Sequence, residues 1–339
     1  MIKKIYLLLL LTVIIGRSGI AQTLDVHFNG SVFFDNREYK EFLKRSRTYS
    51  GTRLALDVGL NLDSTNRFVV GANGLHEFGG KPYFLHVDPV AYYEHNGKNW
   101  FFNGGEFPRE GLLTDYPRSM LNDTLRYFRP NIEGLYTSYH TGNFRENLWI
   151  DWVSRQTDTD REQFLFGLSG KYQPLGPFYI AHYLFILHDA GPAIDIPNDH
   201  IRDNGALQIK LGADLSHKTM FDSLTVEAGG MMSFERERNV SGFKKPKGFV
   251  ANVYLSYKRF ALNDEFYKGQ GHNITYGDAY YQFKTYNRID LIYTPFLYKG
   301  LKGQFIASFH QTPQSSGSNQ EAFRLSYDLG RKKIAKFKD

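Results

Sequence analysis

The side chains best suited to chemistry gather in one stretch, residues 107–129, where arginines and aspartates stand among aromatic residues and a Leu-Leu pair. The charged members are Arg109, Asp115, Arg118, Asp123, Arg126 and Arg129. A segment this long without regular structure is usually functional. If it folds into a narrow water-filled passage, its arginines would set the charge selectivity of that passage. In the alternative interpretation, the stretch packs as a lid and the arginines pair with Asp115 and Asp123.

A second set of charges alternates with apolar residues along otherwise hydrophobic segments. Its members are Arg53, Asp57, Lys210, Asp214, Glu227, Arg288, Asp290 and Arg324. Opposite charges on neighbouring strands form cross-strand pairs that stabilise a sheet. The same residues would also create a transverse field across a pore, and the two roles are compatible.

Catalytic constellations are harder to find. The chain has 11 histidines and no cysteine, and several histidines lie near serine, threonine or acidic residues. A lipid-hydrolysing barrel needs a serine and a histidine held together with a third orienting group, but no local motif of this kind stands out. His-rich patterns and the spacing expected of metal ligands are also missing from the sequence. We therefore expect no enzymatic activity, no cofactor and no metal, with a lipid hydrolase as the less favoured alternative.

The elements that must position these charges follow from a strict alternation of apolar and polar residues. In the stretch 54–62, leucine or valine occupies every second place, with Ala, Asp, Gly and Asn between them. A period of two places all the large apolar side chains on one face of a β-strand. The same alternation recurs in 207–216, 249–258 and 323–329. Since a lysine or arginine facing lipid at the bilayer midplane costs roughly 2–4 kcal/mol, the polar face must line a wet lumen.

About 16 such segments follow one another, most of them about 9–12 residues long, which is the length with which a tilted strand crosses a bilayer. They cover 24–34, 50–62, 67–78, 83–94, 99–106, 130–140, 144–154, 162–172, 178–188, 205–216, 223–236, 248–258, 260–267, 279–293, 301–310 and 321–329. Short turns alternate with longer loops, as in bacterial barrels with periplasmic turns and extracellular loops. We predict an all-β fold, a single antiparallel transmembrane β-barrel of about 16 strands, with 14 or 18 as alternatives.

The N-terminus has the features of a cleaved signal peptide. Lysines precede an apolar run of about 11 residues, and small residues end at Ala21. The run is shorter than the roughly 20 residues that a transmembrane helix needs. We expect residues 1–21 to be removed, 22–330 to form the barrel and 331–339 to remain as a basic periplasmic tail. The net charge of +6 falls mainly in the signal peptide and the tail, so the nearly neutral barrel argues against a nucleic-acid partner.

Several short segments carry a family resemblance. They are FFDNREY at 33–39, SGTR at 50–53, GEFPR at 105–109 and RYFRP at 126–130. With these segments, the alternating pattern and the N-terminal signal, the chain resembles outer-membrane β-barrel proteins of the Bacteroidetes, many of them described as porin-like. The resemblance implies location in the outer membrane of a Gram-negative bacterium and a pore or uptake role, without indicating a solute. Such barrels commonly end on an aromatic residue that the assembly machinery reads, whereas this chain continues past Leu329. The signal is then expected either in Phe337 or in the strand 323–329 itself.

The function expected from the sequence is a porin or channel for passive passage of small hydrophilic solutes, because about 16 strands enclose a water-filled lumen. The alternatives are an outer-membrane barrel enzyme acting on lipid, and a non-conducting adhesin or assembly barrel whose lumen is filled by residues 107–129. The expected partners are outer-membrane lipid and lipopolysaccharide, the barrel assembly machinery and the transported solutes, with a homo-oligomer as a further option.

Overall fold

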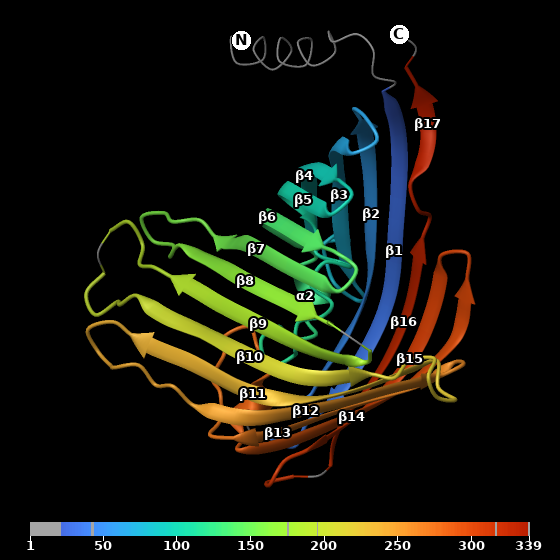
Figure 1. The fold of residues 1–339 in the computed structure, drawn as a ribbon. Helices are drawn as coiled ribbons and strands as arrows, with labels where there is room; N and C mark the ends of the chain where they lie inside the picture. Colours follow the sequence, from blue (N-terminus) through green and yellow to red (C-terminus); the bar gives the residue numbers. More distant parts are fainter. Residues whose placement is uncertain (1–21, 42–43, 175, 195, 316, 338–339) are drawn as a thin grey trace.

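Sixteen strands form one antiparallel sheet that closes into a barrel, because β1 pairs with both β2 and β16 (Figure 1). The computed structural model describes residues 22–41, 44–174, 176–194, 196–315 and 317–337. The strands are β1 (Thr23–Glu38), β2 (Arg47–Asn61), β3 (Asn66–Glu77), β4 (His86–Asn96), β5 (Trp100–Pro108), β6 (Asn131–His140), β7 (Phe144–Ser154), β8 (Gln163–Tyr172), β9 (Phe178–Asp189), β10 (Arg202–Asp214), β11 (Ser223–Glu237), β12 (Lys247–Tyr257), β13 (Phe260–Gly269), β14 (Thr285–Tyr298), β15 (Leu301–Gln311) and β16 (Ser318–Asp328). Each overlaps one segment expected from the alternating pattern, so the prediction of a 16-strand barrel is confirmed.

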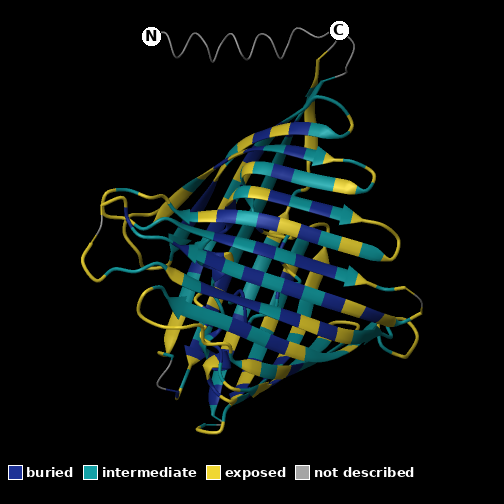
Figure 2. Ribbon diagram, turned by 60° about the vertical axis from the view of Figure 1, so that its left-hand side comes forward, coloured by how far each residue is buried: buried dark blue, intermediate teal, exposed yellow. Residues whose placement is uncertain are grey.

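The two faces of the wall separate side chains as the sequence predicts. On β2, Leu56 is 53% exposed whereas the neighbouring Asp57 is 3% exposed. On β10, Leu211 is 66% exposed and Lys210 is 7% exposed. Figure 2 shows this alternation as buried and exposed bands along the strands. The apolar face therefore points outward, where a bilayer would surround it, and the charged face points into the lumen.

The two ends of the barrel differ in their connections. At one end, β12 and β13 are joined by two residues. The turn after β2 is also tight, because the Asp63 carboxylate accepts backbone N–H bonds from Thr65 and Asn66, both at 2.7 Å. The connections at the other end are mostly longer. From the rule for bacterial barrels, we expect the long-loop end to be extracellular and the short-turn end to be periplasmic.

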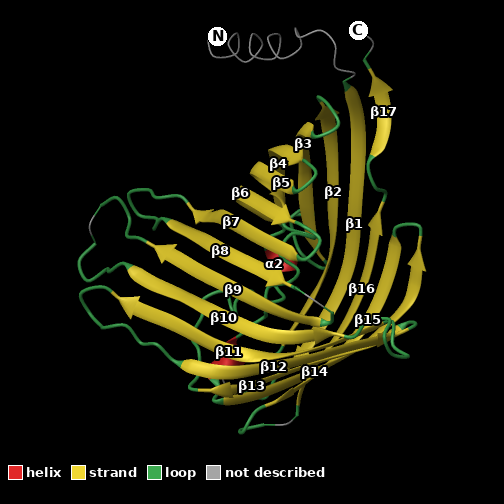
Figure 3. Cartoon of the chain, viewed as in Figure 1, coloured by secondary structure: helices red, strands yellow, loops and turns green. Residues whose placement is uncertain are grey.

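Two of the long connections fold into the lumen. Lumen loop 1 (109–130) follows β5 and carries the short helix α2 (Leu125–Phe128), and lumen loop 2 (270–284) follows β13. Figure 3 marks the short helical turns of both loops among the long strands. Tyr280 of loop 2 is fully buried and belongs to one apolar cluster that reaches Trp149 on the inner wall. The long-loop half of the barrel therefore has a hydrophobic core where the sequence suggested an open passage.

The lumen loops also contact each other. The Asn122 backbone N–H donates to the Tyr276 carbonyl oxygen at 2.8 Å. A Cβ on Gly277 would lie 2.1 Å from the Ser119 carbonyl oxygen, so only glycine permits this approach of the two backbones. The two loops therefore pack as one unit inside the barrel.

One strand begins later than the sequence pattern predicts. A strand is expected over 279–293, but β14 starts at Thr285. Residues Ala279–Gln282 form the 3-10 helix η1 instead, which starts where Asp278 accepts a hydrogen bond from the Tyr280 N–H at 3.1 Å. The expected strand is wrong here because the aromatic residues of this segment are buried by the lumen cluster and not by lipid.

The C-terminal segment adds a short strand that the sequence pattern did not indicate. β17 (Lys332–Lys336) pairs with the start of β1, where Lys336 lies opposite Thr23. The predicted signal peptide, residues 1–21, lies outside the described residues. In the described part of the chain, no helix has the length and apolar character needed to cross a membrane.

Candidate functional site

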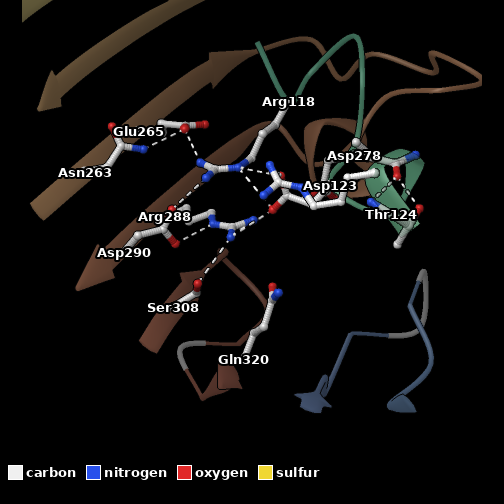
Figure 4. Close-up of polar contacts among 12 residues, drawn as sticks. Arg118, Asp123, Thr124, Asn263, Glu265, Asp278, Arg288, Asp290, Ser308 and Gln320 are labelled. Atoms are coloured by element: carbon white, nitrogen blue, oxygen red, sulfur yellow. Dashed lines mark hydrogen bonds and ion pairs between the residues drawn. The ribbon is translucent and has the colours of Figure 1, made fainter. Parts of the chain in front are cut away.

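Lumen loop 1 is tied to the barrel wall by a network of alternating charges (Figure 4). Arg118 contacts Glu265 of β13 and lies 2.8 Å from Asp290 of β14. Arg288 of β14 is 2.7 Å from Asp290 and 3.3 Å from Asp123 of the loop. Arg118 and Arg288 therefore share carboxylates from both the loop and the wall, which fixes the loop against β13 and β14.

The network also fixes the charge of Asp123. Burial alone would raise the pKa of this carboxyl, but Arg118 and Arg288 hold its pKa well below the ordinary value. Asp123 is therefore ionised at neutral pH. Removal of one member would leave a buried charge without its partner, which is strongly unfavourable.

Three further charges of lumen loop 1 pair with β7. Arg109 contacts Asp151, and Arg129 lies 3.5 Å from the same carboxylate. Asp115 is 2.9 Å from Arg145. Asp151 is fully buried, so the two arginines serve mainly to neutralise it.

Arg126 differs from the other loop arginines. Its side chain is 52% exposed, and its guanidinium is 3.8 Å from Asp123. The six residues predicted as a constriction thus lie inside the barrel, as the inward fold of the loop requires. Most of them form ion pairs that hold the loop, and a role in charge selectivity stays a prediction.

The predicted lumen-facing charges of the wall pair with their neighbours. Lys210 contacts Glu227 on the adjacent strand, and Asp57 lies 3.5 Å from His27. Asp214 accepts a backbone N–H bond within its own turn at 3.0 Å. The Lys210 and Asp57 contacts fit the cross-strand pairing that the sequence suggested, whereas the Asp214 contact is local.

Two other wall arginines bind the helix α2. Arg53 donates to the Tyr127 carbonyl oxygen at 2.6 Å, and Arg324 donates to the Tyr127 hydroxyl at 3.0 Å. The Tyr127 ring stacks on Phe33 with 4.3 Å between the ring centroids. Arg53 and Arg324 therefore act as anchors for lumen loop 1.

A serine–histidine pair exists, but it is not accessible. Ser233 Oγ lies 2.7 Å from His272 Nδ1. The two residues are 2% and 1% exposed. Burial lowers the pKa of His272 to about 4, so the imidazole is neutral. The pair lies on the lumen side behind the hydrogen-bonded strands β11 and β12, and we assign it a structural role.

The outer wall carries an apolar groove that faces the bilayer. The groove has a volume of about 750 Å³ and runs over β12 to β16 and the end of β1. Its outward lining residues include Leu255, Leu262, Leu291, Phe305, Phe323 and Phe34. Phe305 and Phe323 lie 4.8 Å apart between ring centroids, and Phe323 and Phe34 lie 6.4 Å apart. A groove of this size and composition suits an acyl chain.

Polar side chains stand at the long-loop edge of this groove, and we call them the Asn36 cluster: Asn36, Glu38, Thr48 and Glu321. Thr48 Oγ1 donates to Asn36 Oδ1 at 2.7 Å. Asn36 Nδ2 then donates to Glu321 at 3.3 Å and to Glu38 at 3.4 Å. Asn36 shares the outward face of β1 with Phe34, and Glu321 itself lines the groove. The cluster therefore meets the groove at the boundary between lipid and water.

This arrangement can perform acid–base chemistry on a lipid ester. A carboxylate within reach of water is a general base, and an amide N–H stabilises an oxyanion. These residues cannot be recognised as a site from the sequence, because they come from three strands that are adjacent only in the closed barrel. The one available signal was the presence of polar residues on the apolar face of β1 and β16.

Comparison with solved structures defines the class of protein. The chain is similar to OmpTΔL8, a loop deletion mutant of the outer membrane protein OmpT of Vibrio cholerae, with a TM-score of 0.57 and 10% identity over 91% of this chain and 99% of that one. For OccK5 (OpdH) of Pseudomonas aeruginosa, the TM-score is 0.55 and the identity is 10% over 92% of this chain and 99% of that one. For OpdL of the same species, the TM-score is 0.53 and the identity is 13% over 92% of this chain and 99% of that one. The protein is an outer-membrane β-barrel of a Gram-negative bacterium.

The family follows from a second comparison. The model of the Lipid A 3'-O-deacylase-type family matches residues 16–332, so the chain belongs to that family. A comparison with curated proteins found no match. The expectation that the chain is not an enzyme is wrong, because this is an enzyme family. The sequence led to this error because it contains no local serine–histidine motif from which an activity could be inferred.

Proposed function

We propose that the protein hydrolyses an O-linked acyl ester of lipid A, with the acyl chain in the outer-wall groove and the ester beside the Asn36 cluster. The observation that carries this proposal is the groove itself, which faces the bilayer and ends on Glu321 at the long-loop end. Lipid A lies in the outer leaflet, next to that end. The family match supports the choice of substrate.

In the proposed reaction, Glu321 is the general base. It takes a proton from a water molecule, and the resulting hydroxide adds to the ester carbonyl carbon. Asn36 Nδ2 turns one N–H from Glu38 to the carbonyl oxygen, where negative charge develops. The bond between the acyl carbon and the sugar oxygen then breaks, and Glu321 returns its proton to that oxygen. The products are a free fatty acid and a sugar hydroxyl.

Thr48 is a positioning residue in this scheme. Its hydroxyl donates to Asn36 Oδ1, which fixes the amide so that Nδ2 faces the two carboxylates. Loss of Thr48 would leave Glu321 in place but let the amide rotate. The Thr48→Val variant should therefore lower kcat more than it changes KM, because the acyl groove is unaffected.

The test uses purified protein and lipid A in detergent micelles, with mass spectrometry of the lipid. Glu321→Gln should lower the rate of fatty acid release by about 10²-fold or more, since a general base typically contributes 10²–10⁴-fold. Glu133→Gln is the matched control, because Glu133 is also an exposed carboxylate and lies on β6 near the long-loop end of the barrel. Equal rates for the wild type and Glu321→Gln would overturn the assignment.

A second candidate function is a channel for small hydrophilic solutes. The observation that favours it is the polar inner wall of a barrel with sixteen strands, a size that encloses a lumen in other outer-membrane barrels. The lumen loops and their buried aromatic residues oppose a wide passage. Planar-bilayer recording separates the two functions, because only a channel gives large, stable open steps.

A further inference from the structure

A second feature of the outer wall lies on β11 to β13, away from the Asn36 cluster. Lys247 and Lys268 point outward near the long-loop end, and both are exposed. Lys268 lies directly opposite Phe249, and Lys247 is two residues further along the same face of β12. Diagonal neighbours of this kind are about 7–8 Å apart at the backbone, so the two ammonium groups can reach a single small anion.

The wall beside these lysines is hollowed. A depression of about 640 Å³ is lined by residues that include Gly230, Lys247, Phe249 and Lys268. Gly230 lies opposite Phe249 on one side and Ile209 on the other. A Cβ built on Gly230 meets nothing within 4 Å, so the space above it is open. The depression therefore offers an apolar floor between two large side chains, next to two cations.

The surroundings of the depression are rich in positive charge. Lys244 and Lys245 precede Lys247 in the adjacent loop and are exposed, as is Lys284. One of these lysines is paired, because Lys244 lies 3.4 Å from Glu235. Among the residues that the structure describes, no carboxylate forms an ion pair with Lys247 or Lys268.

Unpaired ammonium groups on a bilayer-facing wall need an anionic partner. A lysine is tolerated on such a wall only near the interface, where lipid headgroups lie. A phosphate monoester carries a charge of about −1.5 to −2 at pH 7, which two lysines match. At the long-loop end, the phosphates within reach belong to lipid A of the outer leaflet.

We propose that this depression, the Gly230 hollow, binds a phosphate group of lipid A. The phosphate lies between Lys247 and Lys268, and the first carbons of an acyl chain pass over Gly230 between Phe249 and Ile209. The site extends the proposed function by naming the part of the substrate class that the wall recognises. Binding here does not require hydrolysis.

The test measures binding of lipid A to the whole protein in lipid nanodiscs, with Glu321→Gln as the background so that no lipid is consumed. The Lys247→Ala/Lys268→Ala double variant should bind lipid A at least tenfold more weakly. Lipid A from which the phosphates have been removed should bind weakly to both proteins. Its affinity should be the same with the lysines present and with both lysines replaced. Unchanged affinity of the double variant would overturn the proposal.

A second variant separates charge from shape. Gly230→Leu keeps both lysines and fills open space, so the barrel should fold, and lipid A should again bind more weakly. The control is Lys98→Ala/Lys299→Ala, which removes two lysines from the short-turn end and should leave binding unchanged. Equal binding of inorganic phosphate and lipid A would identify a free-phosphate site and contradict the proposal. If the wild type binds lipid A but does not hydrolyse it, the proposed function is contradicted and the phosphate-binding role of the Gly230 hollow is still supported.

Discussion

Arg118 of lumen loop 1 lies 2.8 Å from Asp290 of β14, so a loop that starts at β5 is bound to a strand on another part of the wall. The same arginine contacts Glu265 of β13. We expect this cross-lumen contact, together with the packing of the two lumen loops, to limit conduction through the barrel.

The first prediction concerns conductance. In planar bilayers the wild type should show small or no open steps, because lumen loop 1 is fixed by Arg118. Arg118→Ala leaves Glu265 and Asp290 without this partner and should raise the mean conductance several-fold. Arg145→Ala, which removes an exposed pair with Asp115, should have little effect. Large stable steps in the wild type would instead support the channel function.

The second prediction concerns the contact between the lumen loops. Gly277→Ala places a methyl group 2.1 Å from the Ser119 carbonyl oxygen, which is a backbone atom that cannot give way easily. We expect a loss of roughly 1–3 kcal/mol, as for other overpacked sites. Gly242→Ala is the control, since its Cβ would meet nothing within 4 Å. Thermal unfolding in detergent measures both, and equal melting temperatures would contradict the packing described.

The third prediction concerns pH. His272 is neutral and buried beside Ser233, with a pKa lowered to about 4 from an ordinary value of 6.5. Between pH 4 and pH 6.5, His272 is protonated in the open loop but neutral in the folded loop. The stability of the folded loop therefore falls as the pH drops from 6.5 to 4, and it is constant below that range. Proteolysis of lumen loop 2 should accelerate over that window. His272→Gln should remove most of this dependence, and an unchanged pH profile would show that another group is responsible.

The fourth prediction concerns orientation. Gly242 lies in a long connection and Gly142 in a short turn, and both have open space around the Cβ position. An impermeant thiol reagent on whole cells should label Gly242→Cys and leave Gly142→Cys unlabelled. Labelling of Gly142→Cys alone would invert the barrel.

The barrel itself could be predicted from the sequence, because alternation is a local property. Leu54 to Leu62 shows which side chains face lipid without knowledge of any partner strand. The segment 279–293 shows the limit of this approach, because its first aromatic residues pack inside the lumen and not against lipid. Tyr280 is buried inside the lumen against Tyr286 and His310 of the wall, not by lipid. A sequence pattern does not distinguish these two apolar environments.

The candidate sites were mostly beyond the reach of the sequence. The charges of lumen loop 1 were identified, because they stand close together in one segment. Asn36 and Glu321 are 285 residues apart and become neighbours only when β1 pairs with β16. Lys247 and Lys268 likewise meet through the register of β12 and β13. Sites built across strands depend on that register, which period-two alternation alone does not define.

The most direct test of the central claim is the mass of lipid A extracted from Gram-negative cells that express the protein. With the wild type, lipid A should lose the mass of one ester-linked acyl chain, and an equimolar amount of fatty acid should appear. With Glu321→Gln at the same level in the outer membrane, lipid A should keep its full mass. Unchanged lipid A in cells that express the folded wild type would contradict the account.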